Sequence, residues 1–156
     1  KSFSFSGIKK TETERAMALA SYRDSWATKQ VFIELRIQGK ELVMERIRGS
    51  RGKKKHIVLP IERVRYLVEA ILTALKQQPQ RQLDHQLFVG MVDTVGKGSL
   101  LIEWAPYFFN TCNALMIRGK TGQCIAVEQQ DVLGFALWLT RQLLVLHERG
   151  EIDIAK

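Results

Sequence analysis

Cysteine, proline and long apolar runs are all scarce in this 156-residue chain. Its two cysteines, Cys112 and Cys124, are too few for a disulfide framework, so we expect both to be buried free thiols. No apolar stretch approaches the roughly 20 residues that cross a bilayer, which argues against a membrane-spanning helix. Because 46% of the residues are hydrophobic, the chain can build one well-packed core, and we predict a single domain over residues 1–156.

The sequence also lacks the common motifs of metal and phosphate chemistry. His56, His85 and His147 are far apart, and no spacing such as C-x-x-C or H-E-x-x-H is present. The P-loop pattern G-x-x-x-x-G-K-[ST] is absent, and nothing marks either cysteine as an activated nucleophile. We therefore expect no enzymatic activity, no catalytic residues, no cofactor and no metal site.

Positive charge is concentrated in the first half of the chain. Residues 1–80 contain 17 Lys and Arg against 8 Asp and Glu, whereas residues 81–156 contain 7 against 8. A positive field in one region attracts nucleic acid or an anionic surface. The densest stretch is residues 46–56, RIRGSRGKKKH, which includes two glycines and no acid. With the P-loop pattern absent, it is consistent with a solvated tail, a nuclear-import signal or a hairpin tip that grips a polyanion.

The first half has the pattern of four strands and a helix. Apolar and polar residues alternate along VFIELRIQ, which is typical of a half-buried strand. Pro60 lacks an N–H, so it ends a strand and suits the first turn of a helix. We predict a weak strand and a turn within residues 16–30, strands at 31–38, 41–48 and 55–61, and a helix at 62–78.

The strand at residues 41–48 has an inconsistent pattern. Leu42 and Met44 would share a face with Arg46 and Arg48 in a regular strand. Either the far end of this strand projects past the core, or a β-bulge shifts its register.

The second half repeats the order. Asp131 is a good N-cap for the last helix, and Gly150 is a good C-terminal stop. We predict strands at 87–93, 99–106, 113–119 and 123–130 and a helix at 131–150. The chain therefore reads as an α+β protein with two β-β-β-β-α repeats, at about residues 14–79 and 85–150.

The last predicted helix is apolar on almost every side. Between Val132 and Leu146 only Thr140, Arg141 and Gln142 are strongly polar. Such a helix must be covered all round, either by both sheets within one protomer or by a second subunit. We expect the second arrangement, with these residues at an oligomer interface: Phe135, Trp138, Leu139, Leu143 and Leu146.

An antiparallel sheet that packs its inner face on helices leaves its outer face to solvent. Basic groups along such a face can contact phosphates, and aromatic rings can stack on unpaired bases. The nucleic-acid-binding residues that we predict are Arg36, Lys40, Arg46, Arg48, Arg51, Lys53, Lys54, Lys55, Tyr22 and Phe32. A membrane surface is a poorer partner, because the chain has no basic amphipathic helix with exposed aromatics.

Two stretches carry a family resemblance: GKKKHIVLPIERVRYLVEAI and QCIAVEQQDVLGFALWL, each a last strand leading directly into a helix. Together with the repeated order, they resemble the Pur-alpha-type and Whirly-type single-strand nucleic-acid-binding proteins over roughly residues 14–148. Within that superfamily the chain is most similar to the kinetoplastid mitochondrial RNA-binding proteins. The lysine-glycine-lysine-alanine stretch of plant Whirly proteins has no clear counterpart.

The resemblance implies a fold and a function. It implies two four-stranded antiparallel sheets packed crosswise, with the helices at the core of a homo- or hetero-tetramer. It implies binding of guide RNA and its annealing to mRNA during RNA editing in the mitochondrion. One alternative is a single-stranded-DNA-binding transcription or maintenance factor, and another is an adaptor subunit that docks an acidic protein. The alternative location is the nucleus.

Overall fold

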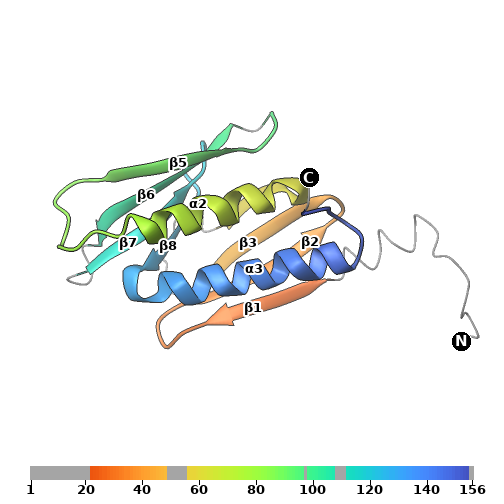
Figure 1. Ribbon diagram of the computed structural model, residues 1–156, viewed down its shortest axis with the longest axis horizontal. Coiled ribbons are helices and arrows are strands. Elements are labelled where there is room, and N and C mark those ends of the chain that lie inside the picture. The colour runs from red at the N-terminus through yellow and green to blue at the C-terminus, as the bar shows by residue number, and fades with distance from the viewer. Residues whose placement is uncertain (1–21, 49–55, 97, 108–111, 155–156) are drawn as a thin grey trace, which may run out of the picture.

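The computed structural model describes residues 22–48, 56–96, 98–107 and 112–154, and it leaves the side chain of Arg48 undescribed. Four strands followed by a helix occur twice (Figure 1). The first set is β1 (Arg23–Ala27), β2 (Phe32–Gln38), β3 (Glu41–Arg48), β4 (His56–Pro60) and α2 (Val64–Lys76). The second set is β5 (Leu87–Asp93), β6 (Ser99–Tyr107), β7 (Cys112–Arg118), β8 (Cys124–Glu128) and α3 (Val132–Glu148). A short 3₁₀ turn precedes each helix, so both helices begin slightly later than the sequence predicts.

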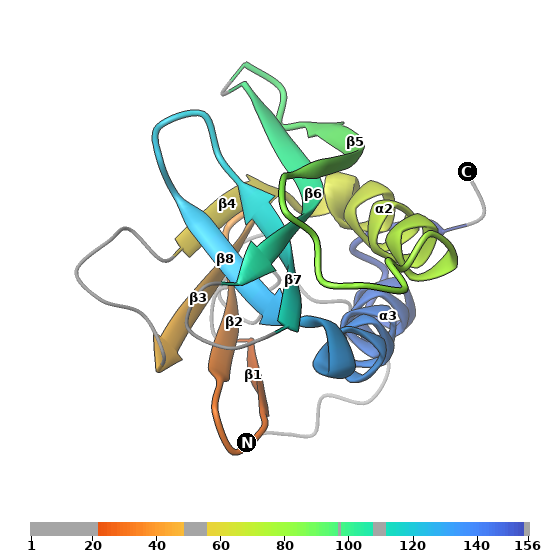
Figure 2. The same cartoon turned by 90° about the vertical axis from the view of Figure 1, so that its left-hand side faces the viewer.

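The strands form two separate antiparallel sheets, ordered β1-β2-β3-β4 and β5-β6-β7-β8. Both helices lie on the same side of the molecule, and α2 packs against α3 (Figures 1 and 2). The predicted α+β architecture with two four-stranded sheets is thus confirmed. No helix in the described part of the chain is long and apolar enough to cross a membrane.

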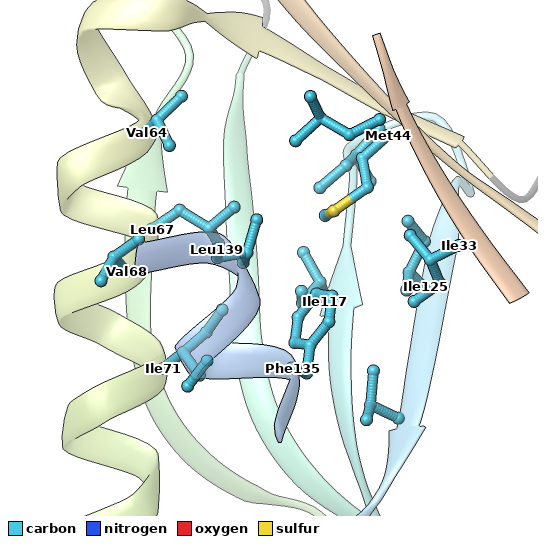
Figure 3. Packing of buried hydrophobic residues seen from close by; sticks show 14 of the residues in the cluster. Ile33, Met44, Val64, Leu67, Val68, Ile71, Ile117, Ile125, Phe135 and Leu139 are labelled. Atoms are coloured by element: carbon cyan, nitrogen blue, oxygen red, sulfur yellow. The ribbon is translucent and has the colours of Figure 1, made fainter. Parts of the chain in front are cut away.

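Strict alternation builds the inner face of the first sheet. Ile33, Leu35 and Ile37 on β2 are completely buried, whereas the residues between them are partly exposed. On α2, Val64 and Ile71 belong to the stripe that helical spacing predicts, and both are buried. Figure 3 shows residues of both sheets and both helices meeting in one hydrophobic cluster.

A bulge shifts the end of β3, whereas Arg46 stays on the buried face of Leu42 and Met44. Ile33 pairs with Arg46, but the next residue towards the amino end of β2, Phe32, pairs with Arg48, so Ile47 is the extra residue. The second of the two alternatives predicted for this strand is therefore the one observed.

Polar groups fix the two helices to the sheets. The indole Nε1 of Trp104 on β6 donates to the carbonyl of Ala74 near the end of α2, at 3.1 Å. On α3, the Nε1 of Trp138 donates to a carboxylate oxygen of Asp24 on β1, at 2.9 Å. The same carboxylate oxygen accepts a hydrogen bond from the side-chain amide of Gln142.

The end of α3 follows the prediction, whereas its start does not. Gly150 has a φ of +78°, and its N–H donates to the carbonyl of His147 while the N–H of Glu151 donates to that of Leu146. These two bonds are the Schellman motif, which favours glycine at this position. Asp131 stands at the N-cap, but its side chain makes no capping hydrogen bond.

The residues predicted at an oligomer interface lie inside the protomer. Phe135, Leu139 and Leu146 are fully buried, and Trp138 and Leu143 are 8% exposed. Trp26 of β1 lies over this region, with ring centroids 5.4 Å from Phe135 and 6.5 Å from Trp138. These five side chains therefore face the protein's own core. The expectation that a second subunit covers them was wrong, because they are already covered within the protomer.

Candidate nucleic-acid interface

The outer face of the first sheet points away from the helices and the core. Its residues alternate with the buried ones on each strand. The side chains on this face include Arg23 and Ser25 of β1, Phe32, Glu34 and Arg36 of β2, Glu45 of β3 and His56 of β4.

Charges in the middle of this face are balanced. The Nη1 of Arg36 lies 3.3 Å from Glu45 and 4.0 Å from Glu34, and the Nη1 of Arg23 lies 3.8 Å from Glu34. Two guanidinium groups and two carboxylates thus form one chain of contacts. Arg36 is on the predicted face, but its charge is already largely compensated there.

Further basic residues lie towards one end of the sheet. Lys29 is exposed in the turn between β1 and β2, beside Phe32 at the start of β2. Phe32 is half-buried and pairs with Arg48, the last residue of β3. The chain leaves the sheet after Arg48 and returns at His56, so residues 49–55 connect at this same end. We call Lys29, Phe32, Arg48 and His56 the basic rim.

Several predicted residues fall on or near this connection. Arg51, Lys53, Lys54 and Lys55 lie outside the described residues. The structure gives only the two points between which this segment runs, the end of β3 at Arg48 and the start of β4 at His56.

Lys40 is exposed at the opposite end of the sheet. It follows Gly39, whose φ of +61° makes the tight turn between β2 and β3. Lys40 is therefore separated from the basic rim by the length of the sheet.

Arg46 points into the protein. It is only 6% exposed, and its Nη1 donates to the carbonyl of Ala126 on β8, at 2.5 Å. The guanidinium thus connects the first sheet to the second. In this position it is not exposed to a phosphate.

Tyr22 also faces inward. Its hydroxyl donates to the side-chain oxygen of Gln142 on α3, and the guanidinium of Arg149 lies 5.4 Å from its ring centroid. Burial, followed by the nearby carboxylate of Asp24, raises the pKa of Tyr22. The ring belongs to the contact between the first sheet and α3, where no base can stack on it.

A cleft of about 290 Å³ lies between the two sheets, and the described residues that line it do not include those of the basic rim. Val58 and Glu41 line it from the first sheet, and Thr94, Lys120 and Gln123 from the turns of the second. It holds one base and one acid, so it adds no net positive charge to the surface.

The described residues offer little for nucleophilic or metal chemistry. The thiol of Cys112 lies 3.6 Å from the carboxylate of Glu128, and burial together with that carboxylate raises the pKa of Cys112 to about 11. A thiol with a raised pKa is a poor nucleophile at neutral pH. Within the described ranges, no group of three or more His, Cys, Asp or Glu could hold a metal ion.

The helix layer carries several exposed leucines. Leu133, Leu137 and Leu144 of α3 are between 47% and 63% exposed, and Leu72 of α2 is 43% exposed. The three leucines of α3 are spaced by four and seven residues, so they lie on one stripe. We call these four residues the outer leucine face.

Sequence reasoning missed Lys29 and Arg23. Both lie in the region where only a weak strand followed by a turn was predicted, so neither could be assigned to a face. The signal available for Lys29 was its position in a turn directly before the strand predicted at residues 31–38.

Neither a search of known protein families nor one of curated proteins found a match for this chain.

Proposed function

We propose that this chain is a non-catalytic, single-stranded RNA-binding protein that holds the RNA by its phosphates along the basic rim. The observation that carries the proposal is where the two ends of residues 46–56 lie, in β3 and β4. The most basic stretch of the sequence begins and ends at one end of a sheet whose outer face is turned away from both helices (Figure 1).

The charge distribution on the sheet supports a path along the rim. In the middle of the face, Glu34 and Glu45 compensate Arg23 and Arg36, so a phosphate there would meet carboxylates. At the rim, Lys29 and Phe32 combine an exposed ammonium with an aromatic ring. Cation and ring together are the usual means of binding a single strand without reading its sequence.

A strand held by its phosphates keeps its bases free to pair. Such a protein promotes annealing, because it lowers the electrostatic repulsion between two RNA strands without covering their base edges. Guide RNA and mRNA in mitochondrial RNA editing are the partners that the resemblance to the kinetoplastid proteins implies. We include them in the proposal on that ground.

We also propose that the protein acts as an oligomer, homo- or hetero-tetrameric, assembled through the outer leucine face. This face replaces the interface residues predicted from the sequence, which are buried. Assembly on the helix side leaves the outer faces of the sheets free for RNA.

The test compares two variants with the same loss of charge. In the rim variant, Arg51, Lys53, Lys54 and Lys55 become Ala. In the control, four exposed basic residues elsewhere become Ala: Lys76, Arg81, Lys120 and Arg149. We expect the rim variant to bind a single-stranded RNA at least tenfold more weakly at 100 mM salt. Its slope of log K against log salt should fall by about 0.7 for each lost phosphate contact.

The control should bind within threefold of the parent in the same filter-binding titration. Equal losses in both variants would show that only net charge matters, and would contradict a localised rim. Competition with single-stranded DNA of the same sequence separates the RNA and DNA alternatives. The adaptor alternative predicts a protein that carries no RNase-sensitive absorbance at 260 nm when it is purified at low salt.

A further inference from the structure

The β5 strand is an unprotected edge of the second sheet. It pairs with β6 alone among the described strands, and Figure 1 shows it as the outermost strand of its sheet. Edge strands normally carry lysine, proline or inward charges that prevent pairing with another chain. The sequence of β5, LFVGMVD, has no basic residue and no proline, and Phe88 and Met91 are 59% and 61% exposed.

β1, an edge strand of the first sheet, differs from β5. β1 has only five residues, and it carries Arg23 and Asp24. Its inward residues are fixed by hydrogen bonds to α3. β1 is thus short and charged, as expected for a protected edge, whereas β5 is longer and apolar.

Gly90 is a second observation on this strand. It does not have a positive φ, and a Cβ built on it would meet no atom within 4 Å. Neither the local backbone conformation nor the packing within the protomer therefore requires glycine here. Glycine inside a strand marks either a bulge, which β5 has beside Gly90, or a place where another backbone approaches closely.

We propose that β5 pairs antiparallel with β5 of a second copy of this chain. The pairing with β6 places Phe88 and Met91 on the outer face, opposite Glu103 and Leu101. A two-fold register exists in which Phe88 of each copy lies opposite Met91 of the other.

In that register Leu87 of each copy lies opposite Val92 of the other, and both are on the inner face. The Phe88–Met91 contact occurs twice, and a thioether beside an aromatic ring is a favourable pair. The bulge between Phe88 and Gly90 is what brings residues 88 and 91 onto one face. The two Gly90 residues then lie near the two-fold axis, where the backbones are closest.

Charge favours a second copy over another occupant. Residues 86–92 contain no ionisable side chain, so nothing on this edge would select a charged peptide. In the proposed register Asp93 lies opposite Gln86 of the other copy, and no like charges are opposed. The inference does not rest on the proposed RNA function, because β5 belongs to the other sheet from the basic rim.

The test uses one pair of positions with two kinds of charge. In the repulsive variant, F88K/M91K, the register brings ammonium groups opposite one another twice. In the complementary variant, F88E/M91K, it brings a carboxylate opposite an ammonium twice. We expect the repulsive variant to have half the native mass of the parent in light scattering, and the complementary variant to keep the parent's mass.

A control variant adds the same two charges to the other edge. S25K/A27K alters exposed residues of β1 and should leave the mass unchanged. Circular dichroism checks that each variant is folded. Hydrogen exchange gives a second measurement: amides of residues 87–92 should exchange at least tenfold faster in the repulsive variant than in the parent.

Two outcomes would overturn the proposal. If the repulsive variant keeps the parent's mass and the exchange rates of residues 87–92, then β5 is not an interface. If the complementary variant dissociates as fully as the repulsive one, then the facing strand is not a second β5 in this register.

Discussion

At the scale of the residue, Arg36 and Arg46 show that the same side chain has two environments on adjacent strands. Arg36 lies on the outer face among carboxylates at 3.3 Å and 4.0 Å. Arg46 is buried and donates to the carbonyl of Ala126. A buried charged hydrogen bond contributes more to stability than a partly exposed ion pair, because removing one partner leaves the other unsatisfied away from water.

We therefore predict that replacing the two arginines lowers the free energy of unfolding by different amounts. Arg46→Ala should lower the free energy of unfolding by about 1.5–3 kcal/mol, as expected for the loss of a charged hydrogen bond. Arg36→Ala should change it by less than about 1 kcal/mol, as is typical of an exposed ion pair. Urea denaturation measures both, and equal losses would contradict the role assigned to Arg46.

The register of Arg48 could not be predicted from the sequence alone. Simple alternation places Arg46 on the face of Leu42 and Met44, where it is buried. For the end of the strand both a projection past the core and a bulge fitted the pattern, and the bulge at Ile47 shifts Arg48 to pair with Phe32. Sequence periodicity along one strand contains no information about the register of the next.

At the scale of the element, one glycine within α3 and one just after its end have opposite requirements. Gly150 adopts a φ of +78° in the Schellman motif, where a Cβ is strained. Gly134 is within the helix, and a Cβ on it would meet the Trp26 ring at ordinary contact distances of 3.6–3.9 Å. Glycine is needed at the first position and is a weakness at the second.

Replacing glycine by alanine should thus change the free energy of unfolding in opposite directions at the two positions. Gly150→Ala should lower the free energy of unfolding by about 1 kcal/mol, because the residue is held in the left-handed region. Gly134→Ala should raise it by about 0.5–1 kcal/mol, because alanine has the higher helix propensity. Thermal unfolding would show shifts of about 2–4 °C in opposite directions. A loss of stability in Gly134→Ala would mean that Trp26 cannot accommodate the methyl group.

The existence of α3 and its C-terminal stop followed from the sequence, whereas its covered faces did not. The periodicity of α2 predicts which of its residues are buried, because that helix also has a polar side. In α3 almost every position is apolar, so composition cannot distinguish Leu139, which is buried, from Leu137, which is 63% exposed. Only the positions of both sheets around the helix settle which leucines face outward.

At the scale of the whole molecule, charge and apolar surface are on different elements. The basic rim is on the first sheet, and the outer leucine face is on the helix layer (Figure 2). Binding of RNA and assembly of subunits should therefore respond to different conditions. Salt screens contacts to phosphate strongly, but it does not weaken burial of leucine side chains.

We predict that assembly through the outer leucine face is insensitive to salt and sensitive to one charge. Leu137→Glu would bury a carboxylate in an apolar contact, which costs several kcal/mol. Its native mass should therefore be half that of the parent, both at 50 mM and at 500 mM salt. Ser25→Glu places the same charge on the outer face of the first sheet and should leave the mass unchanged.

The helix-side and edge-strand contacts should be separable by combination. Leu137→Glu removes one contact and F88K/M91K removes the other, so each variant alone should halve the native mass. Together they should give a monomer of 17.9 kDa. A combined variant that is still twice this mass would require a third contact surface, and a single variant that is already monomeric would mean that only one of the two surfaces joins subunits.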